Sequence, residues 1–249
     1  MRRPTLQFIS DLHLERIFKA PLLSKTDGKY LALLGDIGNP FKNNYLDFIT
    51  QVSYKYEKVF VLSGNHEYWN DTSMEETDIR INTVTDKFSN VHYLNNDHYH
   101  LDNDYTVLGT TLWSHIDSRN REQNNRWGDH GNIKCQDKNI TVDDINTLHS
   151  NCVTWLEQYL SKMKHKKIIV LSHHLPSYKL IIQKYHKKQY INVHDRFASN
   201  LDYLISNPIE AWLCGHSHCK IDTKINDVHC AINAGFSAYE AIPKTIVLS

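Results

Sequence analysis

VFVLSGNHE, residues 59–67, couples a short apolar run to a group of polar residues. The apolar run, residues 59–62, is typical of a strand that is buried on both faces. The polar group begins at Gly64, and glycine can adopt the backbone conformations that a sharp turn requires. The segment therefore predicts a buried strand that presents polar side chains at its carboxyl end.

The same arrangement recurs four times along the chain. Apolar runs lie at residues 6–9, 30–34, 168–171 and 209–213, and each is followed at once or within a few residues by a polar motif. These motifs are Asp11-Leu12-His13, Gly35-Asp36, Ser172-His173-His174 and Gly215-His216-Ser217-His218. Because open α/β sheets bind ligands beyond the carboxyl ends of their strands, the five motifs are predicted to form one site.

Helical patterns lie between the apolar runs. Tyr45, Phe48, Ile49 and Val52 recur at helical spacing. A second helix is predicted to begin at a capping box, Thr141-Val142-Asp143-Asp144. Its apolar stripe is Val142, Ile145, Leu148, Cys152, Leu156, Tyr159 and Met163. A third helix is predicted at residues 196–205, and the alternation of strands with helices indicates an α/β domain.

Two regions favour shorter strands without helices, residues 93–113 and 220–248, where a second and more antiparallel sheet is expected. Residues 115–139 are polar and aperiodic, and this length is unusual for an ordinary connection. That stretch is expected to be either a functional or a mobile loop. Without an internal repeat or a low-complexity linker, the sequence predicts a single domain over residues 1–249.

The overall composition narrows the classes of function. The 28 Lys and Arg residues balance the 28 Asp and Glu residues, so no basic excess points to nucleic acid, although a local basic groove is compatible with this balance. Five cysteines without a CxxC pair indicate free thiols in a reducing compartment. Neither an apolar run of about 18 residues nor an apolar leader is present, so we expect no membrane span and a cytoplasmic protein.

The five motifs supply Asp, Asn and His at the density that two adjacent metal ions need. Oxygen and imidazole ligands without a thiolate suit Mn, Fe or Zn. Asp36 is a carboxylate that can bridge two cations. The residues at 11 and 13, like those at 216 and 218, are two apart, and in extended backbone such residues point to the same side. Each pair can therefore offer two ligands to one site.

In their order along the chain, these motifs resemble the calcineurin-like metallophosphoesterase superfamily. The pattern of that family is DxH, GD, GNH(D/E), a later His and then GHxH, and the chain matches every part from Asp11 to His218. The resemblance implies a four-layer αββα sandwich, in which two mixed β-sheets are flanked by helices.

The resemblance also implies roles for individual residues. Asp11, His13, Asp36 and His218 would hold the first of two divalent metal ions. Asp36, Asn65, His173 and His216 would hold the second, so that Asp36 bridges the two ions. By the family pattern His173 is the ligand, and His174 is the alternative. A hydroxide between the ions would attack phosphorus in line.

Three residues are expected to contact the substrate: Asn65, His66 and Arg126. His66 is the predicted catalytic residue, which would contact the phosphate or protonate the leaving group. Arg126 belongs to an Arg- and Asn-rich stretch, residues 119–127, that is either a solvated loop or a substrate contact. Glu67 is expected to support the site, and Trp69 is expected to pack in the core.

The implied function is the hydrolysis of a phosphate monoester or diester. In protein Ser/Thr phosphatases GD extends to GDxxDRG, whereas here Asn39 replaces the second Asp and no Arg follows, which argues against that branch. A metal-dependent nuclease is the first alternative, disfavoured by the balanced charge. The second alternative is a scaffold that has lost catalysis. Metal content after purification would distinguish it from an enzyme, because a scaffold could hold no metal whereas an enzyme should hold or need about two ions per chain.

Overall fold

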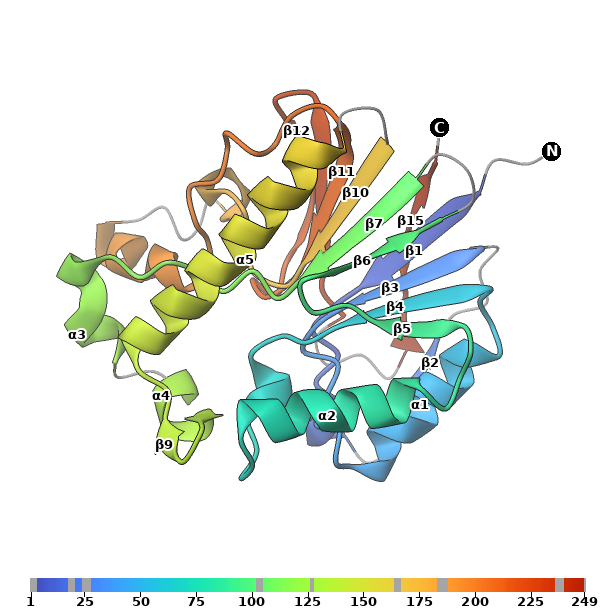
Figure 1. Ribbon diagram of the computed structural model, residues 1–249, viewed down its shortest axis with the longest axis horizontal. Coiled ribbons are helices and arrows are strands. Elements are labelled where there is room, and N and C mark those ends of the chain that lie inside the picture. Colours follow the sequence, from blue (N-terminus) through green and yellow to red (C-terminus); the bar gives the residue numbers. More distant parts are fainter. Residues whose placement is uncertain are drawn as a thin grey trace.

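The computed structural model describes residues 4–17, 21–23, 28–101, 105–125, 128–163, 167–182, 188–235 and 240–248. Two sheets lie face to face in it, with helices on their outer faces (Figure 1). The first sheet has five strands, in the order β15 (Lys244–Val247), β1 (Thr5–Ile9), β3 (Tyr30–Leu34), β4 (Lys58–Leu62) and β5 (Val91–Tyr93). Only β15 is antiparallel to its neighbour within this sheet.

The second sheet has six strands. Their order is β12 (Lys220–Ile225), β13 (Val228–Asn233), β11 (Ile209–Cys214), β10 (Lys167–Ser172), β7 (Tyr105–Thr110) and β6 (Asp97–His100). The four inner strands are parallel, and the two edge strands are antiparallel to their neighbours. Two small sheets pair β2 (Leu22–Leu23) with β14 (Glu240–Ala241), and β8 (Lys134–Cys135) with β9 (Lys138–Asn139).

All five predicted strands are confirmed, but they are divided between the two sheets. β1, β3 and β4 belong to the first sheet, and β10 and β11 belong to the second. Residues 93–113 and 220–248, where a second and more antiparallel sheet was expected, do supply the antiparallel pairs β6–β7 and β12–β13 of the second sheet, but the inner strands of that sheet are parallel. The β6–β7 and β12–β13 hairpins extend the parallel strands β10 and β11 at either side, and β15 extends β1.

Burial on both faces explains the continuous apolar runs. In β10, Ile169 and Leu171 pack between the two sheets, whereas Ile168 and Val170 pack beneath the outer helix. Since successive side chains of a strand point to opposite faces, a strand between two apolar layers must be apolar at every position. The same alternation holds for β3, in which Ala32 faces the second sheet and its neighbours face the helices.

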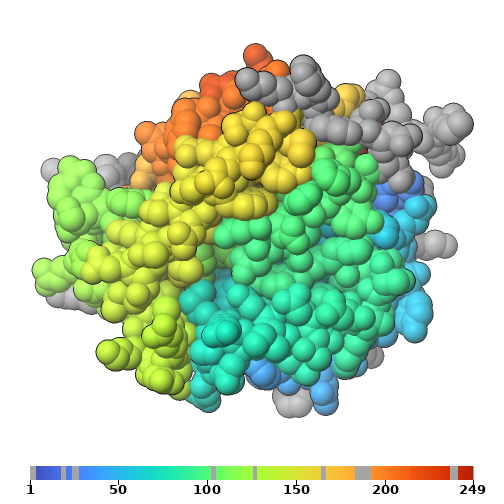
Figure 2. All heavy atoms as spheres, in the orientation of Figure 1, coloured from blue at the N-terminus to red at the C-terminus, as the bar shows by residue number. Residues whose placement is uncertain are grey.

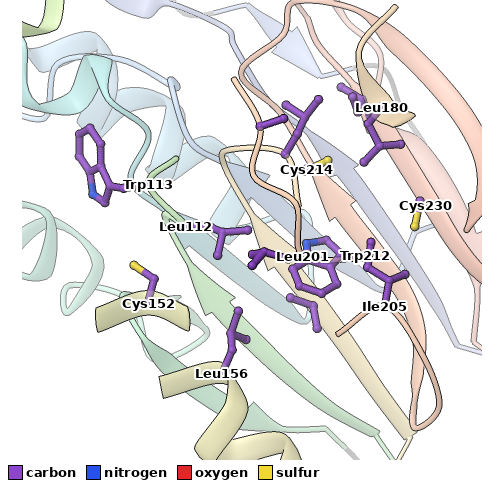
Figure 3. Close-up of a cluster of buried hydrophobic side chains, with 14 of the residues drawn as sticks. Leu112, Trp113, Cys152, Leu156, Leu180, Leu201, Ile205, Trp212, Cys214 and Cys230 are labelled. Carbon is purple, nitrogen blue, oxygen red and sulfur yellow. The ribbon is translucent and has the colours of Figure 1, made fainter. Parts of the chain in front are cut away.

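Helices complete a four-layer sandwich, as the family resemblance implied. α1 (Asn43–Ser53) and α2 (Met74–Thr85) pack on the outer face of the first sheet, and α5 (Val142–Lys162) covers the second. Figure 2 shows α5 as a band of side chains across one face of the molecule, beside the β6–β7 hairpin. Beneath it, Cys152 and Leu156 of α5 and Trp212 of β11 belong to one buried cluster (Figure 3).

The predicted start of α5 is confirmed. The side chain of Thr141 accepts a hydrogen bond from the backbone N–H of Asp144, whose carboxylate accepts from the backbone N–H of Thr141. α1 is confirmed as well, with Tyr45, Phe48, Ile49 and Val52 buried. α2 was not predicted, although Ser73 and Glu76 form a second capping box at its start.

The predicted helix at residues 196–205 was wrong. A 3₁₀ segment, η6 (Lys188–Arg196), ends where that helix was expected to begin. Beyond it, the chain pairs with the segment that follows β10: the N–H of Leu175 donates to the carbonyl of Phe197 (2.9 Å), and the N–H of Ser199 donates to the carbonyl of Leu175 (3.1 Å). These tertiary hydrogen bonds override the local apolar spacing.

Two further expectations concern covalent bridges and membranes. None of the five cysteines forms a disulfide, and three of them are buried. No helix within the described ranges has both the length and the apolar character that crossing a membrane requires.

Candidate metal centre

The seven predicted ligand residues meet where strands of both sheets end. Asp11 and His13 follow β1, Asp36 follows β3, and Asn65 follows β4. His173 follows β10 of the second sheet, and His216 and His218 follow β11. The carboxyl ends of the inner strands thus bring motifs far apart in the sequence to one place.

The backbone at the site is strained. Five of the seven residues have a positive φ: 56° at Asp11, 49° at His13, 53° at Asp36, 64° at His216 and 49° at His218. The left-handed region costs an L-residue about 1–2 kcal/mol, and such strain concentrates at functional sites. The two-apart pairs are therefore brought together by left-handed turns, and the expectation of extended backbone was wrong.

Two glycines allow the strand ends to approach closely. A Cβ atom on Gly35, which has a φ of +81°, would lie 2.6 Å from both the nitrogen of Gly64 and Nδ1 of His173. A Cβ atom on Gly64 would overlap Oδ1 of Asp36. Any larger residue at either position would push the motifs apart.

The first cluster contains Asp11, His13, Asp36 and His218, with one ligand atom from each within 4.8 Å of the others. Nε2 of His13 lies 3.1 Å from Nε2 of His218 and 3.8 Å from Oδ2 of Asp36. Nε2 of His218 lies 3.4 Å from Oδ1 of Asp11. Ligand atoms about 2.0–2.2 Å from an ion stand about 3–3.5 Å from one another, so most of these separations suit a shared cation.

The second cluster contains Asp36, His173 and His216. Nε2 of His173 lies 3.4 Å from Oδ1 of Asp36, 3.2 Å from Nδ1 of His216 and 3.2 Å from Oδ1 of Asn65. Asp36 therefore belongs to both clusters. His174 belongs to neither cluster, and its Nδ1 lies 3.3 Å from the carbonyl of Thr111.

Hydrogen bonds on the far side of each ring fix which nitrogen faces the second cluster. Nδ1 of His173 donates to the carbonyl of Leu34 (2.8 Å), and Nε2 of His216 donates to the carbonyl of Arg196 (3.1 Å). In the neutral form of each ring, the other nitrogen therefore presents a lone pair to the cluster. Asn65 and Asp36 add oxygen acceptors, so the neutral cluster is a set of acceptors that a cation would satisfy.

The carboxylates at the centre are buried and incompletely hydrogen-bonded. Oδ1 of Asp11 and Oδ2 of Asp36 have no hydrogen-bond partner in the described structure. These are the two oxygen atoms that face the histidines of the first cluster. Buried carboxylates normally pair with charged partners or coordinate metals, so the residues present fit the divalent ions that the fold family implies.

Burial and neighbouring charges shift the pKa values of the site residues in different directions. Burial alone would raise the pKa of Asp36, yet the charge of His173 and their mutual hydrogen bond hold it well below the ordinary value. Conversely, burial would lower the pKa of His173, but Asp36 raises it to about 9. Burial raises the pKa of Asp11 to about 6. Burial and the neighbouring His13 lower the pKa of His218 to about 4, which leaves its imidazole neutral as a ligand must be.

Glu15 links two histidines of the site. Its Oε1 accepts a hydrogen bond from Nδ1 of His13 at 2.9 Å and lies 3.7 Å from Nδ1 of His66. Burial would raise the pKa of Glu15, but its hydrogen bond with His13 and its contact with His66 lower it to about 2. A carboxylate on the outer nitrogen of a histidine orients the ring and makes the inner nitrogen a better ligand.

Glu67 fixes the backbone around Asp36. Its carboxylate is fully buried and accepts from the backbone N–H groups of Asp36 (2.8 Å), Ile37 (2.7 Å), Gly38 (3.1 Å) and Gly64 (2.6 Å). This side chain joins the loop after β3 to the loop after β4. The expected supporting role thus consists of holding the turn that presents Asp36, while the His66 ring is positioned by other residues.

Asp129 comes from the aperiodic loop and orients Asn65. Its Oδ1 accepts from Nδ2 of Asn65 (2.8 Å) and from Nε1 of Trp69 (2.7 Å). With its nitrogen engaged in this way, the amide of Asn65 turns its oxygen toward His173. This part of residues 115–139 therefore belongs to the site.

His66 lies at the mouth of the site, with its backbone N–H donating to Oδ1 of Asp36 (2.8 Å). Its ring stacks on Trp69, with 3.9 Å between ring centres. Burial acts to lower the pKa of His66, but Glu15 and Asp36 raise it above the ordinary value. Trp69 is partly buried: it packs against the core cluster, as expected, and it also lines the cleft over the site.

An open cleft of about 580 Å³ lies over both clusters. Asp36, Asn65, His66, His216 and His218 line one part of it. Arg126, the predicted substrate-binding arginine, lies outside the described residues. Of its neighbours, Arg119 pairs with Asp117 and Arg121 pairs with Asp143 in exposed ion pairs.

The sequence model of the family described as calcineurin-like phosphoesterase matches residues 5–220. The chain belongs to this family. It is thus a metal-dependent phosphoesterase. It is also 35% identical over 252 residues to an uncharacterised protein of Acanthamoeba polyphaga mimivirus, a match that covers 92% of this chain and 89% of the viral protein.

Two solved structures share the fold of this phosphoesterase. Phosphopantetheinyl hydrolase of Mycobacterium tuberculosis is similar with a TM-score of 0.71 at 15% identity, over 94% of this chain and 90% of that chain. A protein of Thermus thermophilus is similar with a TM-score of 0.54 at 11% identity, over 92% and 88% of the two chains.

Sequence reasoning about this phosphoesterase missed two residues at the site. Glu15 follows His13 by two positions, but it lies in the 3₁₀ segment Leu14–Arg16, so strand alternation does not mark it. Asp129 lies in a stretch without periodicity, 64 positions beyond Asn65, and no local signal marks it.

Proposed function

We propose that this phosphoesterase is a binuclear enzyme that cleaves a phosphate monoester or diester. Asp11, His13, Asp36 and His218 would hold one divalent ion. The second ion would be held by Asp36, Asn65, His173 and His216. The observation that carries the proposal is the pair of clusters that share the buried Asp36. Mn, Fe and Zn all suit this set of nitrogen and oxygen ligands.

Different residues of the chain would have different roles in this reaction. Two bound cations would neutralise phosphoryl oxygens and lower the pKa of a water that lies between them. Asn65 would contact the phosphate group from beside the second cluster. His66 lines the cleft and has a raised pKa, so its imidazolium can donate a hydrogen bond to the phosphate or a proton to the leaving group. Glu15 and Trp69 hold that ring in place.

The proposal assigns this activity to one domain, residues 1–249, and to an organic phosphate ester. A nucleic acid is not favoured, because the chain carries equal numbers of basic and acidic residues. The unbridged cysteines support a reducing compartment, in our proposal the cytoplasm.

The test is hydrolysis of p-nitrophenyl phosphate and of bis-p-nitrophenyl phosphate. Chelator-treated protein is re-supplied with Mn²⁺, Fe²⁺ or Zn²⁺, and bound metal is counted by elemental analysis. We expect about two ions per chain and activity that returns with metal. The ratio of the two rates assigns monoester or diester preference. Folded protein that binds two ions and cleaves neither ester would contradict the proposal.

Asp36→Asn is the matched variant for the shared carboxylate. Because Asp36 belongs to both clusters, we expect this substitution to weaken both ions together and to abolish the activity that metal restores. Loss of only one ion, measured by elemental analysis, would rule out a bridging role. Asp47→Asn, on α1 and outside both clusters, is the control for the loss of one negative charge.

A further inference from the structure

The cleft over the clusters is lined by residues of two kinds. Some are the polar residues of the proposed metal centre. Others are apolar, namely Ile181, Ile182, Val193 and Phe197, all from the chain that connects β10 to β11. We call these four residues the apolar wall. Since the wall and the clusters line one cleft, a molecule whose phosphate lies at the clusters has the wall beside it.

Three of the four wall residues are accessible to a ligand. Ile181 is buried, whereas Ile182, Val193 and Phe197 are each only partly buried. Apolar side chains beside a polar reaction centre gain free energy when a ligand removes them from water. The cleft, about 580 Å³, is also within the range of about 300–1,000 Å³ that is typical of sites for organic ligands.

Aromatic rings adjoin the clusters on two separate segments. Trp69 stacks on His66, and the ring of Phe197 lies 5.2 Å from the ring of His216. The guanidinium carbon of Arg196 lies 5.5 Å from the centre of the Phe197 ring, a cation–π arrangement that helps to hold the ring. Both aromatic side chains line the cleft, where a flat ligand could pack against them.

We propose that the apolar wall binds the leaving group of the substrate, and that this group carries a bulky apolar part of about the size of an aromatic ring. This inference rests on the proposed function, because it assumes that the phosphate lies at the clusters. The wall would determine which leaving group is preferred, and the metal centre would carry out the hydrolysis, so the two roles can be tested separately.

The test compares two esters that have the same scissile bond, propyl phosphate and 3-phenylpropyl phosphate. The distant phenyl ring does not change the chemistry of the leaving oxygen, so a difference in kcat/KM reports binding of the ring. In the metal-loaded enzyme we expect kcat/KM to be on the order of tenfold to a hundredfold higher for the phenyl ester, the range expected for burial of one large apolar group. A ratio near one would overturn the inference.

Ile182→Ser and Phe197→Ala are the wall variants, and both should reduce this ratio toward one. The ratio cancels any change that affects both esters equally, such as a disturbance of His216 by loss of the Phe197 ring. Ile79→Ser is the matched control, because Ile79 is an exposed isoleucine of α2 that does not line the cleft. An unchanged ratio in both wall variants would overturn the inference, even if metal-dependent hydrolysis persists.

A binding measurement keeps the wall testable if neither ester is cleaved. Propylphosphonate and 3-phenylpropylphosphonate carry a C–P bond that resists hydrolysis, and calorimetry gives their affinities for the metal-loaded protein. Tighter binding of the phenyl compound that is lost in Ile182→Ser and Phe197→Ala would support the wall, even though the absent hydrolysis counts against the proposed function. Equal binding of the two phosphonates would overturn the wall.

Discussion

At the scale of single residues, His66 is the side chain whose role in catalysis can best be tested without disturbing metal binding. It lines the cleft but belongs to neither of the clusters that share Asp36. We predict that His66→Ala leaves the bound metal nearly unchanged and lowers turnover by about 10²-fold or more, the usual contribution of a general acid. Elemental analysis and steady-state kinetics measure the two effects.

The control for His66→Ala is His98→Ala, which removes a partly exposed histidine of β6 outside the clusters. Its turnover should match that of the unmodified chain. If His66→Ala also keeps full turnover, His66 has no part in the reaction.

Glu15 acts through the two histidines that it holds. Glu15→Gln keeps the size of the side chain but removes the negative charge beside His13 and His66. Loss of such an outer hydrogen bond typically costs about 10–100-fold in metal affinity or activity, and we predict a loss in this range. Metal titration and kinetics check it, with Glu57→Gln, an exposed carboxylate that pairs with Lys29, as the control. If the metal affinity and kcat of Glu15→Gln equal those of the control, Glu15 contributes neither to metal binding nor to catalysis.

The sequence indicated the position of some residues of the site but not the roles of others. Asp11, His13 and Asp36 follow apolar runs within a few residues, so the motif and the strand end together indicated where they lie. The roles of Glu67 and Asp129 depend on partners from other loops, four backbone N–H groups in one case and the amide of Asn65 in the other. Contacts of this kind are created by the fold and leave no local pattern.

At the scale of elements, α5 shows how a local signal anchors an outer layer. Thr141→Ala removes the side-chain cap on the N–H of Asp144 and should cost about 1 kcal/mol. For a domain of this size the melting temperature should fall by about 2–4 °C. Thermal unfolding measures the loss, and Thr141→Ser, which retains the hydroxyl, should restore most of it. Equal destabilisation by both variants would show that the hydroxyl does not supply the stability.

Elements were predictable where local signals and tertiary packing agree. The capping box and apolar stripe of α5 agree, and that helix was predicted at its true start. α2 has a capping box but buries only four of its residues, so its stripe is weak and it was overlooked. The backbone of residues 197–201 forms hydrogen bonds with the backbone of Leu175 and Pro176. The spacing of apolar residues within 196–205 does not indicate these partners.

At the scale of the whole molecule, the clusters join the two sheets. Asp11, His13, Asp36 and Asn65 come from the first sheet, and His173, His216 and His218 come from the second. A ligand that binds only the folded state stabilises it by about 2.7 kcal/mol when its concentration is 100 times its dissociation constant. We predict that saturating Mn²⁺ raises the melting temperature of the chelator-treated protein by about 5–10 °C.

Differential scanning calorimetry with increasing Mn²⁺ measures this shift. The Asp36→Asn variant should show a much smaller one, because it lacks the shared carboxylate. A shift of equal size in the variant would mean that Mn²⁺ stabilises the fold at some other place.

The residues alone did not indicate which strands pair with one another. Each apolar run indicated a strand with two buried faces, but nothing in the run specified its neighbours. β10 and β11 could have joined β4 in one sheet as readily as β7 and β13 in another. The family resemblance supplied the two-sheet arrangement, which the structure confirms.

The left-handed turns at the clusters have a consequence for how such a chain would change over generations. His218 is about one-third exposed and holds a φ of 49°, a conformation that glycine adopts at far lower cost. As long as selection maintains the metal centre, that cost is tolerated. In a lineage released from this selection, glycine or asparagine at position 218 would relax the backbone, so folding itself would favour the loss of the ligand. Decay of the active site would then proceed faster than neutral drift, and it would leave a protein more stable than its functional ancestor.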